Sequence, residues 1–128
     1  MTDDYWVYAH RKHGEYPEYT SRGGKWLIFV SSLNLDALWT KIKNAVENGS
    51  LGGMAKAPAK RNPPFQSSNH GVICVYTYDW EDVQDVKRIR QELRRLGIRR
   101  KISYKTDEDT EQGMYRANSG DKISKYYE

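Results

Sequence analysis

The segment that most constrains the fold of this chain is an unbroken run of β-branched, apolar and aromatic residues from Val72 to Tyr78. Such a run is typical of a strand that is covered on both faces. Asp79 follows it directly, and an aspartate there can cap a helix through its carboxylate. The run therefore predicts a central strand that leads into a helix, and strand alternation predicts that Tyr76 and Tyr78 share one face.

A strand followed by a helix is also predicted in the first half of the chain. Residues 25–30 form a second continuous apolar run and indicate a strand. From 35 to 48, apolar residues recur at three- and four-residue steps, which indicates a helix with one buried stripe. Asn34 stands where an N-cap belongs, and Leu33 before it can form a hydrophobic staple with Leu38.

The second helix is predicted from Trp80 to Leu96, with Asp79 as its N-cap. Acidic residues lie in its first turns and Arg94 and Arg95 in its last turn, an order that complements the helix dipole. The buried stripe of this helix is expected to consist of Val83, Val86, Ile89 or Arg90, Leu93 and Leu96.

A third strand, rich in cations, is predicted over residues 98–105. Alternation places Arg99, Lys101 and Lys105 on one sheet face, spaced by roughly 6.6 to 13 Å along the strand. That spacing is comparable to the spacing of successive phosphates in a nucleic acid. Shorter strands are expected within residues 5–8, 50–57 and 114–116.

The order of these elements predicts an α+β fold in which both helices pack on one face of a sheet. The opposite face would then be free to bind a ligand. With 128 residues, the chain is predicted to form a single domain. Three less regular parts are expected within it: a loop-rich arm at 1–24, a basic, proline-rich loop at 58–69 and a polar tail at 117–128.

The sequence lacks the motifs of several functional classes. It contains no Walker loop, no dinucleotide-binding glycine fingerprint, no nucleophile elbow and no zinc ligand set. No apolar run approaches the ~20 residues of a membrane span, so no membrane attachment is expected. The single cysteine, Cys74, fits a reducing, cytoplasmic setting and a small core residue. No metal ion and no cofactor are predicted.

Basic and aromatic residues give the strongest indication of a ligand. The net charge is +4, and cations gather between Lys87 and Lys105. This clustering favours an anionic partner, although a solvated helix face is the alternative interpretation. The ten tyrosines and four tryptophans offer flat rings on which bases can stack. The predicted site combines cations for phosphates with tyrosines for a base: Lys56, Tyr76, Tyr78, Arg99, Lys101, Lys105, Tyr115 and Arg116.

Four groups of residues resemble a known protein family. They are the run 25–30, Gly49-Ser50-Leu51-Gly52 with Ala55-Lys56, the run 72–77, and Tyr104-Lys105-Thr106-Asp107 with Thr110, Gly113 and Tyr115. On these motifs, the chain is similar to the basophilic-leukaemia-expressed protein family. The resemblance implies the fold of the cap-binding translation initiation factor, a curved, mainly antiparallel sheet with helices on its convex side. In that factor, the concave face stacks a methylated guanine between two tryptophans and holds phosphates with basic residues.

We expect the chain to bind a nucleotide or RNA, without catalysing a reaction, on a basic, tyrosine-bearing face of the sheet. One variant of this function is a viral-type sponge that sequesters a signalling nucleotide. A second class is an enzyme, a phosphate-eliminating lyase or a phosphoesterase, with Lys105, His70 or His13 as its base. A third is a domain that binds a protein partner through exposed tyrosines. The sequence leaves these alternatives open.

Overall fold

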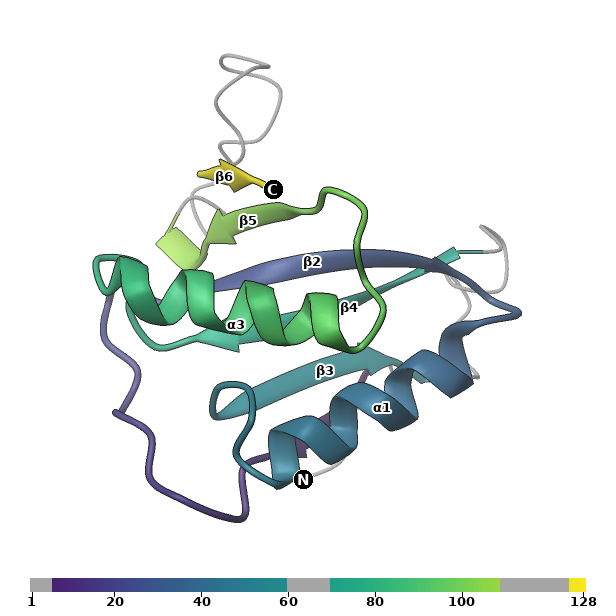
Figure 1. Cartoon of the computed structure of the whole chain (residues 1–128), viewed down its shortest axis with the longest axis horizontal. Helices are drawn as coiled ribbons and strands as arrows, with labels where there is room; N and C mark the ends of the chain where they lie inside the picture. The colour runs from purple at the N-terminus through teal and green to yellow at the C-terminus, as the bar shows by residue number, and fades with distance from the viewer. Residues whose placement is uncertain (1–5, 60–69, 109–124) are drawn as a thin grey trace.

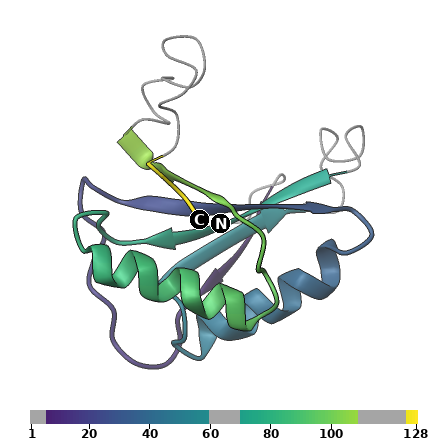
Figure 2. The same ribbon diagram turned by 45° about the horizontal axis from the view of Figure 1, so that its top comes forward.

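The computed structural model describes residues 6–59, 70–108 and 125–128, and it shows two helices packed on one face of a six-stranded antiparallel sheet (Figure 1, Figure 2). The elements are β1 (Trp6–His10), β2 (Gly24–Ser31), α1 (Leu35–Glu47), β3 (Met54–Pro58), β4 (His70–Thr77), α3 (Val83–Arg95), β5 (Ser103–Thr106) and β6 (Tyr126–Tyr127). The strand order in the sheet is β1-β3-β4-β2-β5-β6. The predicted α+β class, with both helices on one face of a curved sheet, is confirmed.

β4 lies in the interior of the sheet, as the prediction of a central strand requires. It pairs with β2 along its whole length and with β3 on its other side. Ile73 and Val75 are fully buried on the helix side, and Cys74 between them is also buried. The continuous apolar run therefore marks an interior strand of the sheet.

The strand ends at Thr77, one residue earlier than the sequence predicts. The backbone N–H of Tyr78 donates to the phenol oxygen of Tyr16 (3.2 Å), and its carbonyl accepts from the N–H of Thr20 (3.1 Å). The backbone of Tyr78 is thus bound to the N-terminal arm instead of to a neighbouring strand. Strand alternation stops at that point, so the prediction that Tyr76 and Tyr78 share one face is wrong.

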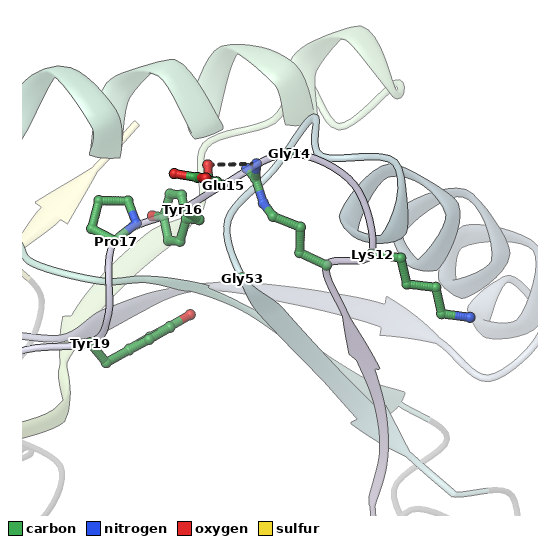
Figure 3. A pocket seen from close by; sticks show the side chains of 8 residues that line it. Lys12, Gly14, Glu15, Tyr16, Pro17, Tyr19 and Gly53 are labelled. Carbon is green, nitrogen blue, oxygen red and sulfur yellow. Dashed lines mark hydrogen bonds between the residues drawn. The ribbon is translucent and has the colours of Figure 1, made fainter.

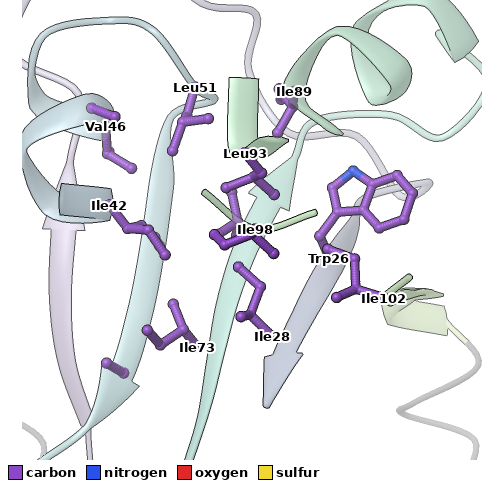
Figure 4. Packing of buried hydrophobic residues seen from close by; sticks show 14 of the residues in the cluster. Trp26, Ile28, Ile42, Val46, Leu51, Ile73, Ile89, Leu93, Ile98 and Ile102 are labelled. Carbon is purple, nitrogen blue, oxygen red and sulfur yellow. The ribbon is translucent and has the colours of Figure 1, made fainter. Parts of the chain in front are cut away.

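The hydrophobic core lies between the sheet and the two helices (Figure 4). Along β2, every second residue is buried there, namely Trp26, Ile28 and Val30. The ring of Trp26 meets that of Tyr104 at 5.2 Å between centroids, and its indole N–H donates to the carbonyl of Val86 (3.2 Å). Trp26 therefore connects an inner strand to helix α3.

α1 buries Ile42 and Val46, as its apolar stripe predicts, but its N-terminus differs from the prediction. A turn closed by the Asn34 N–H and the Ser31 carbonyl (3.1 Å) leads into the helix. Asn34 has α-helical backbone angles there, and its side chain makes no capping hydrogen bond. Leu33 lies in this turn and is 93% exposed, so the predicted hydrophobic staple does not form.

α3 begins at Val83, three residues later than predicted, and its N-cap is Asp82 instead of Asp79. The carboxylate of Asp82 accepts from the backbone N–H of Asp85 (3.1 Å). Asp79 instead accepts from the guanidinium of Arg22 (2.9 Å), which holds the pKa of this carboxyl below its ordinary value. Because the helix starts late, Val83 lies in its first turn and is exposed, contrary to the predicted stripe.

Arg90 is the polar member of the predicted α3 stripe, and it is fully buried. Its guanidinium donates to the carbonyls of Ile98 (3.0 Å), Arg100 (2.6 Å) and Glu128 (2.9 Å). These bonds hold the segment after α3 against the helix and outside the sheet. The predicted third strand therefore starts five residues late, at the beginning of β5.

The last residues of the chain form β6, which pairs with β5, although the sequence indicates only a polar tail there. Tyr126 packs against Tyr104 at 5.5 Å and against Trp26 at 6.4 Å between ring centroids. Backbone hydrogen bonds on both sides of β6, between Lys125 and Tyr104 (2.8 Å) and between Ile102 and Glu128 (2.8 and 3.0 Å), act together with these aromatic contacts to hold the strand. The strand predicted within residues 114–116 lies outside the described residues.

Gly52, in the loop between α1 and β3, lies against the end of β4, and a substitution there tests this contact. A Cβ atom added there would lie 2.4 Å from the backbone carbonyl oxygen of Tyr76. We expect Gly52→Ala to lower the free energy of unfolding by about 2 kcal/mol, because a backbone atom at the end of β4 must shift. Urea denaturation followed by circular dichroism measures this loss.

Gly53→Ala is the matched control, since its Cβ would come no closer than 3.4 Å to the neighbouring side chain of Tyr16. It should change stability little. An equal loss for the two substitutions would contradict the packing described at Gly52.

Candidate functional site

The sheet face opposite the two helices is the candidate site, and we call it the open face (Figure 2). Its side chains alternate along each strand with those of the core. In the described part of the chain it carries Trp6 and Tyr8 on β1, Lys56 on β3, Cys74 and Tyr76 on β4, Lys25, Leu27 and Phe29 on β2, Ser103 and Lys105 on β5, and Tyr127 on β6. The open face thus combines aromatic rings with lysines.

The register of the sheet brings three of the predicted site residues together. Lys56 lies opposite Cys74, while Lys25 lies opposite Tyr76 on one side and Lys105 on the other. Directly opposed residues have Cβ atoms about 4.5–5.5 Å apart. Because Cys74 and Tyr76 are two residues apart on one strand, Lys56, Tyr76 and Lys105 lie in two neighbouring rows of the open face.

β1 contributes aromatic rings to one side of the open face. The ammonium of Lys56 lies 4.0 Å from the ring centre of Trp6. Such a cation–π contact contributes about 0.5–1 kcal/mol at an exposed site. The ring of Tyr8 stacks on that of His10 at 6.3 Å between centroids. A cation and several flat rings therefore lie next to one another on β1 and β3.

Lys25 lies on β2 in the same row as Tyr76 and Lys105, between β4 and β5. Its ammonium is 2.7 Å from a carboxylate oxygen of Asp107 and 5.9 Å from the ring centre of Tyr76. Tyr19 of the N-terminal arm approaches the Tyr76 ring edge-on, at 6.3 Å between centroids. Burial raises the pKa of the Tyr76 phenol far above its ordinary value. This phenol therefore stays protonated and can donate a hydrogen bond to an anionic oxygen.

Tyr78 is a predicted ligand contact that the structure places away from the open face. Its phenol donates to the carboxylate of Asp82 at the start of α3 (2.5 Å), and this hydrogen bond raises the pKa of Tyr78 to about 12. Its ring also meets that of Tyr16 edge-on, at 5.4 Å between centroids. Tyr78 therefore stabilises the junction between β4 and α3. Tyr115 and Arg116 lie outside the described residues.

The three cations that the sequence places on one sheet face are separated in the structure. Lys105 belongs to β5 and lies on the open face. Arg99 and Lys101 precede β5, and Arg99 borders a hollow at the end of α3. The ammonium of Lys101 lies 5.9 Å from the ring centre of Tyr127, at the edge of the sheet. The prediction of one shared face is therefore wrong for Arg99, because the segment before β5 is not a strand, whereas Lys101 lies at the margin of the open face beside Tyr127.

Several residues of the open face and its border are not among the predicted site residues, among them Trp6, Tyr8, Lys25 and Asp107. A signal for the first two is present, since Trp6 and Tyr8 alternate with apolar residues on a short strand. The pairing of Lys25 with Asp107 joins residues 82 positions apart. It depends on the register of β2 with β5, which no local pattern reveals.

The N-terminal arm between β1 and β2 forms an open hollow of about 460 Å³ (Figure 3). Arg11 lies in its wall and donates to the carbonyls of Glu15 (3.0 Å), Gly49 (3.0 Å) and Leu51 (2.7 Å). This guanidinium therefore clamps the loop after α1 to the arm. Tyr19 borders the hollow on the side of the open face.

The open face has the groups needed to bind an anion and a flat ring. Ammonium and phenol groups donate to phosphate oxygens, and aromatic rings stack on bases. Within the described ranges, no group of three or more His, Cys, Asp or Glu side chains is placed to hold a metal ion.

Burial raises the pKa of the Cys74 thiol. Neither helix of the described part is long and apolar enough to cross a membrane.

A curved antiparallel sheet with two helices behind it and an open face in front defines a fold that occurs among solved structures. The chain is similar to a schistosome eIF4E, whose crystal structure was solved in complex with m7GpppA and 4E-BP, with a TM-score of 0.62 and 18% sequence identity. The match covers 84% of this chain and 59% of that chain, so this chain spans less than two thirds of its length. The expected fold, that of the cap-binding initiation factor, is confirmed.

The family model of the basophilic leukemia-expressed protein Bles03 matches residues 18–111. The chain therefore belongs to the Bles03 family, as its motifs predict. The structure explains one of these motifs, in which Tyr104 bonds Thr77 in the core (2.5 Å) while Asp107 pairs with Lys25. That motif joins the core to the open face.

Proposed function

We propose that this chain binds a phosphate-containing ligand, a nucleotide or RNA, on its open face and does not transform it. One observation carries the proposal: Lys56, Tyr76 and Lys105 share the open face with the rings of Trp6 and Tyr8. We place this binding in the cytoplasm, where Cys74 stays reduced.

In this proposal the lysines bind phosphate oxygens and the rings bind the base. A charge-assisted hydrogen bond contributes about 1.5–3 kcal/mol, and stacking of a base on an aromatic ring about 1–3 kcal/mol. Part of this gain is offset by the loss of translational freedom and by side-chain ordering. We therefore expect a dissociation constant in the micromolar to millimolar range at low salt.

The solved relative supports the choice of ligands for the test. That eIF4E is in complex with m7GpppA, a capped dinucleotide, and with 4E-BP. We therefore include m7GpppA beside ATP, GTP and a short RNA. A protein partner is the second class of molecule that the open face or the helix side of this fold could bind.

We expect these ligands to quench tryptophan fluorescence saturably and to raise the Tm at low salt. Lys56→Gln and Lys105→Gln should each weaken binding about tenfold, because each removes a charge-assisted contact to phosphate. Raising the salt concentration should weaken binding to the unchanged chain as well. Fluorescence titration measures each dissociation constant.

Lys41→Gln is the matched control, because Lys41 is exposed on α1 and the substitution removes the same charge. Equal weakening by this control would contradict a specific role of the open face. If none of the four ligands binds at low salt, the proposal fails. Turnover of a phosphorylated substrate that disappears in Lys105→Ala, with binding retained, would support an enzyme instead.

A further inference from the structure

A second cationic surface lies at the end of α3, on the helix side of the sheet. A hollow of about 450 Å³ there is lined by Gln91, Arg94, Arg95 and Arg99, so that three guanidinium groups and no carboxylate border it. Arg100 and Lys101 follow directly in the chain. We call the five cations of this region the basic rim: Arg94, Arg95, Arg99, Arg100 and Lys101.

Local structure explains only part of the charge of the basic rim. Arg94 and Arg95 lie in the last turn of α3, where cations complement the helix dipole. Arg94 donates to the carbonyl of Arg99 (3.2 Å), and Arg95 pairs with Glu92 (3.1 Å). Within the described ranges, Glu92 is the only carboxylate that forms an ion pair with the rim. A guanidinium has five N–H donors, so most of this donor capacity is available to a ligand.

Two cations of the rim, Arg94 and Arg100, lie close enough to Arg90 for their charges to disfavour its charged form. Burial, and after it the charges of Arg94 and Arg100, lower the pKa of Arg90 to about 10. An anion bound beside Arg94 and Arg100 would offset this effect of their charges on Arg90. The Arg95–Glu92 pair is exposed, and exposed ion pairs contribute little, so removing the charges of Arg95 and Arg99 should change stability little.

The basic rim continues around the end of the sheet to the open face. The guanidinium of Arg100 donates to the carbonyl of Phe29 in β2, and Lys101 lies beside the ring of Tyr127 in β6. Both rings belong to the open face and are well exposed, Phe29 to 60% and Tyr127 to 63%. Cations and accessible aromatic rings are thus neighbours at this end of the sheet.

We propose that the basic rim binds the sugar–phosphate backbone of a single-stranded polynucleotide that extends from the open face past Phe29 to the hollow at the end of α3. The inference rests on the proposed function of the open face and adds that the ligand is a strand instead of a mononucleotide. One guanidinium group can donate two parallel hydrogen bonds to the oxygens of one phosphate. Exposed rings such as those of Phe29 and Tyr127 stack on bases of any kind. An acidic peptide would engage the cations but would leave these rings without partners.

The test compares strand lengths in a variant that lacks two rim charges, Arg95→Gln with Arg99→Gln. Fluorescence anisotropy follows binding of labelled oligouridylates of about 5 and about 20 nucleotides, and of a DNA strand of the longer length. We expect the variant to bind the longer RNA about tenfold more weakly at about 50 mM salt, with a salt slope shallower by about 1.4, as for two lost phosphate contacts. Binding of GTP and of the short RNA, and the Tm of the free protein, should not fall.

The control variant, Lys41→Gln with Lys43→Gln on α1, removes the same number of charges and should leave affinity and slope unchanged. The inference is overturned if both double variants weaken binding equally, or if the longer strand binds no more tightly than the short one. It is also overturned if heparin binds as tightly as the RNA. In these cases, binding of GTP would still support the proposed function of the open face. If the chain binds neither GTP nor any strand, the proposed function itself is refuted. The affinities for the RNA and DNA strands of equal length show which of the two nucleic acids the chain prefers.

Discussion

Trp26→Ala is expected to lower the free energy of unfolding by about 4 kcal/mol. Trp26 is fully buried in β2, where its ring packs against Tyr104 and Tyr126 and its N–H binds the carbonyl of Val86. Alanine removes these contacts and leaves a cavity between the sheet and α3. Single domains have only about 5–15 kcal/mol of stability in total, so this loss is large. Urea denaturation followed by far-ultraviolet circular dichroism measures it.

Trp39→Ala is the matched control for this prediction, because Trp39 lies half-buried on α1 at the margin of the core. Its removal should cost about 1.5 kcal/mol, since less apolar surface returns to water. The loss of unfolding free energy for Trp26→Phe should lie between those of Trp26→Ala and Trp39→Ala, because phenylalanine keeps an aromatic ring but loses the hydrogen bond. Equal losses for Trp26→Ala and Trp39→Ala would show that Trp26 is not central to the core.

Arg90→Met is expected to lower the free energy of unfolding by about 3 kcal/mol. Methionine fills much of the space of the arginine, but the carbonyls of Ile98, Arg100 and Glu128 lose their donor in a buried site. The same bonds position the segment that carries the basic rim. Binding of a long polynucleotide should therefore weaken as well, in the anisotropy titration described above.

Arg88→Met tests whether any arginine of α3 would have this effect. Arg88 is more exposed, donates to the carbonyl of Ser50 (2.9 Å) and pairs with Asp85 (2.9 Å). Its replacement should cost less than about 1 kcal/mol. Arg90→Lys should not restore stability, because an ammonium lacks the planar fork of donors that reaches three carbonyls. Full stability of Arg90→Met in urea would contradict the role assigned to Arg90.

The strands and helices could be predicted because hydrophobic periodicity is local. The apolar run ending at Tyr78 and the stripe over 35–48 each report burial through neighbouring residues alone. The ends of helices and strands differ from the predicted ones where a side chain binds a partner that is distant in the sequence. Asp79 satisfies the local rule for an N-cap, but Arg22, 57 residues earlier in the chain, binds its carboxylate. Asp82 then takes the capping position.

The candidate site was less predictable than the fold. Lys56, Tyr76 and Lys105 lie on one face because each alternates with a core residue within its own strand, which a sequence can show. Arg99 and Lys101 have a similar alternating pattern. They leave the sheet because the buried guanidinium of Arg90 binds the carbonyls around them, and no pattern of the third strand contains that information.

The sequence by itself determined the class of fold, most of the buried stripe of each helix and the interior position of β4, because neighbouring residues set the burial of each element. Only the tertiary structure decided where these elements end and which cations share a face with aromatic rings. The contacts that decide this, such as Arg22 with Asp79 and Lys25 with Asp107, join residues 57 and 82 positions apart. They form only when the register of the sheet brings their strands and loops together, and register depends on the whole fold.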